Sequence, residues 1–254
     1  MQNQEAYSQW CPTIQETNAL GYRRYVEEIK QVDQIWYWLS QNYPEVIALD
    51  APHAFNAETF TYKEVASLIK DASVGFSLLG LQRGDVIALF GENSPRWLIV
   101  DQGLMRVGAS DAVRGSSAPV DELLYILEDS KAVGVIVQNH QLWKKLDLSS
   151  DLVSQFKVVV QLEGETDSGV MSWESLIKLG QSNGNSETNA DLNVLEAQAP
   201  DTATIIYTSG TTGRPKGVPL SHPNLLHQMK ALACVANPSA GSSVLSVLPI
   251  WHAY

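Results

Sequence analysis

The chain has 254 residues, of which 44% are hydrophobic, and 28 acidic residues outweigh 17 basic ones to give a formal net charge of −11. This apolar fraction is ordinary for a globular protein, and the length permits one large domain or two modest ones. The acidic balance argues against a nucleic-acid partner, because phosphate contacts need clustered Lys and Arg. No apolar run reaches the roughly 18 residues of a membrane span, and residues 1–13 lack an apolar signal core.

A cytoplasmic protein is therefore expected, and peripheral contact with a membrane is compatible with that location. The two cysteines, Cys11 and Cys234, lie far apart and have no partners at metal-ligand spacing. They are expected to be reduced thiols, and no protein-only metal site is expected.

The first half of the chain predicts alternating helices and strands. Thr61 and Glu64 form a capping-box pattern ahead of an amphipathic helix that ends near Gly80. Ser94 and Pro95 likewise suit the N-cap and first turn of a helix that ends at Gly108. The other expected elements are a helix before residues 43–44, strands at 86–90, 111–114 and 133–137, and a helix at 119–127.

The second half predicts strands at 158–160, 203–207, 218–220 and 244–248, a helix at 173–179, and a helix after Ser221 in which His222 belongs to the capping structure. Short loops between alternating elements favour an α/β fold with largely parallel, helix-covered sheets. Residues 181–200 are polar and aperiodic, which is typical of a linker or a surface excursion. They divide the chain into an α/β part at 1–180 and a segment at 201–254.

The loop between the strands at 203–207 and 218–220 carries the chemistry. It reads Tyr-Thr-Ser-Gly-Thr-Thr-Gly-Arg-Pro-Lys-Gly at residues 207–217. Glycines let the backbone turn its N–H groups toward an anion, hydroxyls add donors, and the lysine adds a positive charge. This inventory suits a polyphosphate. The candidate phosphate-binding residues are Thr208, Ser209, Gly210, Thr211, Thr212, Gly213 and Lys216.

Two better-known phosphate motifs do not fit this loop. A Walker A loop places Lys directly after the second glycine and continues into a helix, whereas Arg214 and Pro215 intervene and a strand is expected to follow. The G-x-G-x-x-G dinucleotide turn is also absent from it. On composition alone, a flexible Ser/Thr/Gly surface loop is the alternative.

The order of residue types at 207–218 closely resembles the signature loop of the adenylate-forming superfamily. This superfamily includes acyl-CoA synthetases and the adenylation domains of peptide synthetases. The resemblance continues through residues 81–95 and 122–130. It implies the large N-terminal domain of these enzymes, with ATP and Mg²⁺ as cofactors. The implied reaction joins a carboxylate to ATP, giving an acyl-adenylate and pyrophosphate, and then transfers the acyl group to a thiol.

Three further segments are similar to the long-chain fatty acyl synthetases of cyanobacteria and plastids, which include acyl–acyl carrier protein synthetases. They lie at residues 97–103, 111–116 and 248–252. This branch implies a fatty acid substrate and either CoA or acyl carrier protein as acceptor. On chemistry alone His252 suits a structural role and Trp251 a core position. The resemblance instead implies that His252 lies beside the acyl-adenylate, and Trp251 could line the acyl pocket.

The family's adenine-binding segment, ribose-binding aspartate and C-terminal catalytic-lysine domain have no counterpart in these residues. The sequence is therefore expected to be an N-terminal fragment of a long-chain fatty acid ligase, inactive alone and without a complete catalytic set. An open sheet edge and an exposed apolar face are expected with it. The alternative is a non-catalytic remnant, or a protein that binds a nucleotide or a partner.

Overall fold

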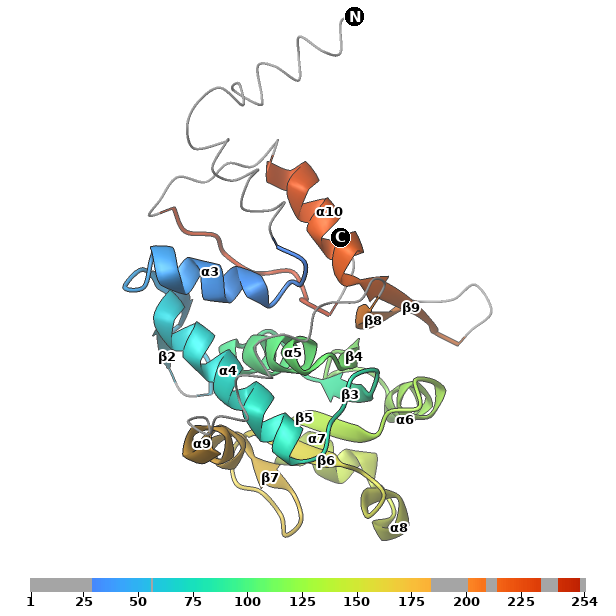
Figure 1. The fold of residues 1–254 in the computed structure, drawn as a ribbon. Helices are drawn as coiled ribbons and strands as arrows, with labels where there is room; N and C mark the ends of the chain where they lie inside the picture. The colour runs from blue at the N-terminus through green and yellow to red at the C-terminus, as the bar shows by residue number, and fades with distance from the viewer. Residues whose placement is uncertain (1–28, 56, 184–200, 209–213, 234–241, 252–254) are drawn as a thin grey trace, which may run out of the picture.

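The computed structural model describes residues 29–55, 57–183, 201–208, 214–233 and 242–251, and its elements alternate along the chain as Figure 1 shows. The described helices are α3 (Gln34–Asn42), α4 (Tyr62–Leu78), α5 (Pro95–Val107), α6 (Val120–Asp129), α7 (His140–Leu146), α8 (Ser150–Val153), α9 (Trp173–Asn183) and α10 (His222–Ala233). The strands are β1 (Ile47–Ala51), β2 (Glu58–Thr61), β3 (Val86–Phe90), β4 (Ser110–Arg114), β5 (Gly134–Asn139), β6 (Val158–Glu163), β7 (Met171–Ser172), β8 (Thr202–Thr208) and β9 (Lys216–Ser221).

A seven-stranded sheet in the order β7-β6-β5-β3-β4-β8-β9 forms the centre of the fold. Every neighbouring pair in it is parallel except β8 and β9, which are antiparallel. The prediction of a largely parallel α/β sheet is confirmed. Strands on both sides of the 184–200 stretch belong to this sheet, since β8 pairs with β4.

Helices cover both faces of the sheet because side chains of a strand alternate between faces. In β3, Ile87 and Leu89 pack into a core with α4, α5 and α9, whereas Ala88 and Phe90 pack with α6 and α7. Figure 1 shows the same division, with α4, α5 and α9 on one side and α6 and α7 on the other. None of the helices within the described ranges is long and apolar enough to cross a membrane.

The predicted helix ends are confirmed in atomic detail. The Thr61 hydroxyl accepts the N–H of Glu64, whose carboxylate accepts the Thr61 N–H at 2.8 Å, which is a complete capping box for α4. Ser94 caps α5 by accepting the Trp97 N–H, and Gly108 ends it at φ 79°, a left-handed conformation that glycine adopts without strain.

Helices α4 and α9 pack at very close range. A Cβ atom added at Gly180 would collide with the backbone carbonyl of Asp71, and one at Gly75 would lie 2.8 Å from the Leu176 side chain. Glycine at both positions therefore allows the two helix backbones to approach. This interface closes the outer layer over β3, β5 and β6.

Residues 244–248 form no strand, so the prediction there is wrong. Within the part of the chain that the structure describes, residues 242–248 have no regular secondary structure and pair with no strand. Val244 and Leu245 are each 84% exposed. An alternating apolar pattern describes a half-buried strand only where a neighbouring strand supplies the hydrogen bonds, and no described strand lies beside this segment.

The start of α10 differs from its prediction in the role of His222. Ser221 and Asn224 cap the helix, with the Ser221 N–H donating to Asn224 Oδ1 at 3.0 Å. His222 is buried, and its Nδ1 accepts the backbone N–H of Val32 at 3.2 Å. Burial lowers the pKa of this imidazole, with Asp201 acting in the opposite direction. His222 thus connects α10 to the segment that precedes α3.

Candidate functional site

Three parallel strands, β3, β4 and β8, end at the same edge of the sheet. Ligands of open α/β sheets bind at the carboxyl ends of the strands, where loops bring polar groups together. Here the loops after β3 and β4 contain polar residues 92–94 and 116–117, and the loop after β8 contains the glycine-rich sequence. This edge is the candidate site.

The first and last residues of the predicted phosphate loop are direct partners. In the antiparallel pair β8·β9, Thr208 lies opposite Lys216. The Lys216 side chain is exposed, so its ammonium group is free to reach an anion above the hairpin. The predicted residues Ser209, Gly210, Thr211, Thr212 and Gly213 lie outside the described residues.

A hydrogen-bond cluster centred on Asp129 fixes the base of this hairpin. The hydroxyl of Tyr207 donates to Asp129 Oδ2 at 2.8 Å, and Tyr125 donates to the other oxygen of Asp129 at 3.1 Å. Burial raises the pKa of Tyr207 well above its usual value, and the Asp129 carboxylate adds to the effect, so the phenol stays a donor. The Arg214 guanidinium lies 5.1 Å from the Tyr125 ring centroid, a cation–π contact.

Gly217 completes this base at a position where a larger residue would be crowded. A Cβ atom there would lie 3.0 Å from the Tyr207 ring and 3.1 Å from Ile205. The glycine that closes the motif thus lets β9 lie flat on the buried tyrosine. From the sequence, the motif indicates only phosphate chemistry, and no sequence signal pairs Tyr207 with Asp129.

The side chain of Trp251, predicted to line an acyl pocket, packs against the loop that follows β4. Its ring centroid is 5.4 Å from the guanidinium carbon of Arg114, which also bonds Glu122 Oε1 at 2.6 Å. A Cβ atom at Gly115 would be only 2.5 Å from the Trp251 ring. Sequence reasoning found no chemical role for Arg114, and the structure gives it a contact with a predicted site residue.

The two predicted site segments meet at this edge. Val113 of β4 is level with Ile206 of β8, so the same register places Gly115 level with Thr208. Strand β8 leads into the phosphate loop, and β4 is its neighbour in the sheet. Trp251 covers Gly115, directly after β4, and therefore lies beside the start of that loop. His252 lies outside the described residues, directly after Trp251.

The loop after β3 supplies two residues that sequence reasoning missed. Glu92 Oε1 accepts the Ser116 hydroxyl at 2.9 Å and the Ser117 N–H at 3.3 Å. Asn93 contacts residues 246–250 through its side-chain amide. Their position directly after a predicted parallel strand was the available signal.

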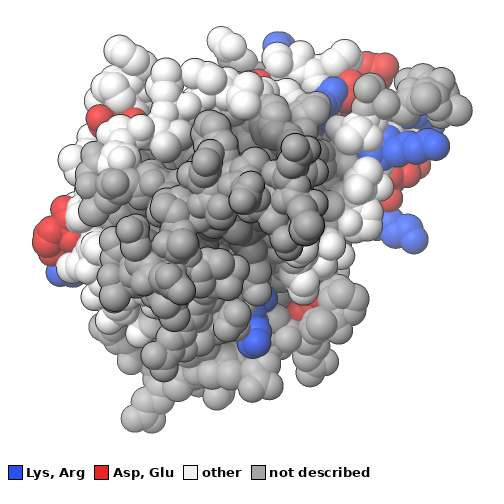
Figure 2. Space-filling view, turned by 90° about the horizontal axis from the view of Figure 1, so that it is seen from above, with Lys and Arg blue, Asp and Glu red and all other residues white. Residues whose placement is uncertain are grey.

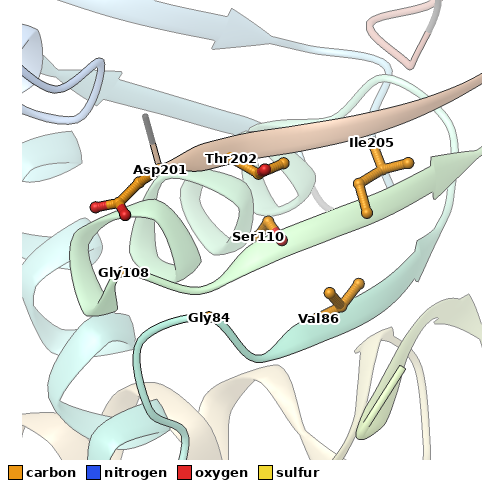
Figure 3. Close-up of a pocket in the computed structure, with 7 residues that line it drawn as sticks. All are labelled: Gly84, Val86, Gly108, Ser110, Asp201, Thr202 and Ile205. Atoms are coloured by element: carbon orange, nitrogen blue, oxygen red, sulfur yellow. The ribbon is translucent and has the colours of Figure 1, made fainter. Parts of the chain in front are cut away.

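A pocket of about 210 Å³ lies at the other end of the strands, beside the amino ends of β3, β4 and β8 (Figure 3). Its lining includes the left-handed glycines Gly84 and Gly108 and the Asp201 side chain, which forms an ion pair with Arg83. Because the phosphate loop begins at the carboxyl end of β8, this pocket belongs to neither predicted site segment.

On the face seen from above, charged side chains of both signs lie along the part that the structure describes. Figure 2 shows Lys and Arg beside Asp and Glu along one rim, where residues are described. Among the described residues, no group of three or more His, Cys, Asp or Glu side chains is placed to hold a metal ion.

Sequence comparison identifies the family. A family model described as AMP-binding enzyme matches residues 37–254. A chloroplastic long-chain-fatty-acid–acyl-carrier-protein ligase from Arabidopsis thaliana is 38% identical over 240 residues, covering 89% of this chain and 33% of the relative. Long-chain-fatty-acid–CoA ligase FadD15 of Mycobacterium tuberculosis is 33% identical over 195 residues, covering 76% of this chain and 32% of the relative. The chain thus spans about a third of the length of these relatives.

Solved structures agree on the fold. A putative long-chain-fatty-acid CoA ligase from Rhodopseudomonas palustris superposes with a TM-score of 0.72 at 18% identity, over 89% of this chain and 53% of that one. The N-terminal domain of FACL13 from Mycobacterium tuberculosis gives 0.60 at 23% identity, over 76% and 45%. On the match of the family model, this chain belongs to the AMP-binding enzyme family.

Proposed function

We propose that this chain forms the N-terminal part of an ATP-dependent long-chain fatty acid ligase. The reaction joins a fatty acid carboxylate to the α-phosphate of ATP, which releases pyrophosphate, and the acyl group then passes from AMP to a thiol. The relatives that match it are named as fatty acid ligases for CoA or acyl carrier protein. The observation that carries the proposal is the pairing of Thr208 with Lys216 at the carboxyl edge of the sheet.

The residues of this hairpin fit the phosphates of ATP. In the proposed role, Thr208 and Lys216 hold the departing pyrophosphate together with the intervening residues Ser209, Gly210, Thr211, Thr212 and Gly213. Negative charge increases on pyrophosphate as the α–β bond breaks, so preplaced hydroxyl, N–H and ammonium donors stabilise the transition state. The Tyr207–Asp129 bond keeps the base of the hairpin rigid, which limits reorganisation during the reaction. Mg²⁺ would enter with ATP as its complex.

The acyl group would lie beside the phosphate hairpin, on the side of β4. Trp251 offers an apolar ring there, and His252 follows it in the chain. We assign Trp251 to the wall of the acyl site and His252 to the neighbourhood of the carboxylate. Arg114 stays paired with Glu122, so its charge is balanced within the chain.

A non-catalytic protein that binds a nucleotide or a partner is the alternative. Two experiments separate it from the ligase. Sequencing the DNA beyond codon 254 shows whether coding sequence for the family's later segments follows. The longest product containing these residues is then given fatty acids of graded length with ATP, and CoA or acyl carrier protein is supplied in turn. The ligase produces an acyl thioester with one acceptor, whereas nucleotide binding without thioester on either acceptor supports the alternative.

A further inference from the structure

We propose that Asn93 is a positioning residue that holds the 246–251 segment across the carboxyl ends of β3 and β4, and thereby fixes the location of Trp251. The inference rests on the proposed function for its link to the acyl site. The holding itself follows from contacts alone and can be tested separately.

Asn93 contacts the segment with both ends of its side-chain amide. Its Oδ1 accepts the backbone N–H of Ile250 at 2.9 Å, while its Nδ2 donates to the Leu248 carbonyl at 2.7 Å and to the Ser246 hydroxyl at 3.3 Å. The three bonds reach alternate residues of one extended stretch. Such an amide replaces, for this stretch, part of the hydrogen bonding that a neighbouring strand would provide.

The apolar side chains at the start of the segment contribute little to holding it in place. Val244, Leu245, Val247 and Leu248 are between 55% and 84% exposed, so apolar burial does not hold them. Ile250 and Trp251 do pack against the main core. Trp251 rests on Gly115 and beside Arg114, and the Asn93 bond to Ile250 lies one residue before it. Loss of that bond should release the ring from the β4 loop.

The loop after β3 also fixes the surface that receives the ring. Glu92, next to Asn93, bonds Ser116 and Ser117, the two residues after Gly115. One short loop therefore holds both sides of the Trp251 contact. We infer that adjacent residues 92 and 93 set the shape of the acyl wall without touching the acyl chain.

The test compares Asn93→Ala, Asn93→Asp and the control Asn42→Ala in the 254-residue chain. Asn42 is an exposed asparagine whose amide donates a local bond to the Trp38 carbonyl. Hydrogen exchange of the Ile250 amide, measured by NMR or in peptides covering 245–251, reports the holding. Calorimetry on the longest gene product that contains these residues, with the same substitutions, then measures binding of a palmitoyl-adenylate analogue with a sulfamate in place of the phosphate, and of inorganic pyrophosphate alone.

Asn93→Ala should speed exchange at Ile250 about tenfold, the loss expected for one hydrogen bond with its neighbours. Asn93→Asp keeps the acceptor for Ile250 and should lie between Asn93→Ala and the wild type. The analogue should bind Asn93→Ala about tenfold more weakly, and pyrophosphate affinity should stay within about twofold.

Wild-type exchange at Ile250 in Asn93→Ala would overturn the proposal, as would a parallel loss of both ligands with a lowered melting temperature. If the wild-type longest gene product binds no analogue, the proposed function fails, and the exchange result alone then decides whether Asn93 holds the segment. The two failures are therefore distinguishable.

Discussion

Thr208 and Lys216, eight positions apart in the sequence, lie directly opposite each other as the last residue of β8 and the first of β9. The hairpin thus presents a hydroxyl and an ammonium group from neighbouring strands at one edge. Residues 209–215 connect these two strands in the sequence. The same hairpin is anchored below by the Tyr207–Asp129 bond.

Replacing Lys216 by Ala should weaken binding of inorganic pyrophosphate by at least about tenfold, because one charge-assisted contact is lost. Lys216 is exposed, so the melting temperature should not change. Calorimetry on the variant measures the affinity. The matched control is Lys178→Ala, an exposed lysine on α9, and equal losses in the two variants would refute the assignment.

Replacing Tyr207 by Phe should lower the free energy of unfolding by about 1 kcal/mol, because a part-buried hydrogen bond to a carboxylate is lost. Tyr37→Phe is the control, since Tyr37 is 58% exposed and should leave stability unchanged. Urea denaturation of both variants provides the measurement. An unchanged midpoint for Tyr207→Phe would show that Asp129 does not anchor the hairpin.

Replacing Gly180 by Ala should destabilise the fold by about 1–3 kcal/mol or more, because its methyl group would collide with the Asp71 carbonyl and push α9 from α4. Ser182→Ala, on an exposed position of the same helix, controls for helix propensity. Thermal unfolding followed by circular dichroism compares them. Stability equal to that of the control would mean that the helices do not approach this closely.

The free energy of unfolding should depend on pH through Asp33, a residue that is only 2% exposed. Burial raises its pKa from 3.8 to about 6, although Arg106 partly opposes the shift. The folded state holds the proton more tightly than the unfolded state, so this contribution is complete below pH 3.8 and is lost as pH rises through about 6. The change is about 3 kcal/mol by linkage.

Asp33→Asn cannot titrate, so its unfolding free energy should fall less than that of the wild type between pH 4 and pH 6.5. Denaturant titrations at several pH values provide the comparison. Burial also raises the pKa of Asp101 and Asp111, and the neighbouring Asp101 charge adds to the shift at Asp111. Asp101 and Asp111 contribute equally to the pH dependence of the wild type and of Asp33→Asn. The difference between the two curves therefore reports on Asp33 alone. Parallel curves would contradict the assignment.

Sequence reasoning succeeded where local chemistry determines local structure. The capping box of Thr61 and Glu64, the Ser94 cap and the Gly108 terminus were each visible within a few residues and are each confirmed. The β1–β2 hairpin and the short helices α7 and α8 were missed. Asn139 and Ser149 cap α7 and α8, so a signal was present in the sequence.

Long-range relationships were not predictable from one sequence. Nothing near Asn93 indicates that it bonds Ile250, 157 residues later. The apolar alternation at 244–248 predicted a strand, but strand formation depends on a partner elsewhere in the chain. Conversely, the phosphate motif indicated the family from its order of residue types alone, and the structure added the Thr208–Lys216 pairing. The roles of Thr208, Lys216, Trp251 and His252 remain predictions.

The most direct test is ATP–pyrophosphate exchange with palmitate and Mg²⁺, using the longest gene product that contains these 254 residues. Exchange should require the fatty acid, and Lys216→Ala should lower it by at least about tenfold while thiol transfer from preformed acyl-AMP falls much less. Fatty-acid-dependent exchange with this split would confirm that the hairpin from Thr208 to Lys216 holds pyrophosphate during adenylation. Absence of exchange, or equal loss in both half-reactions, would contradict it.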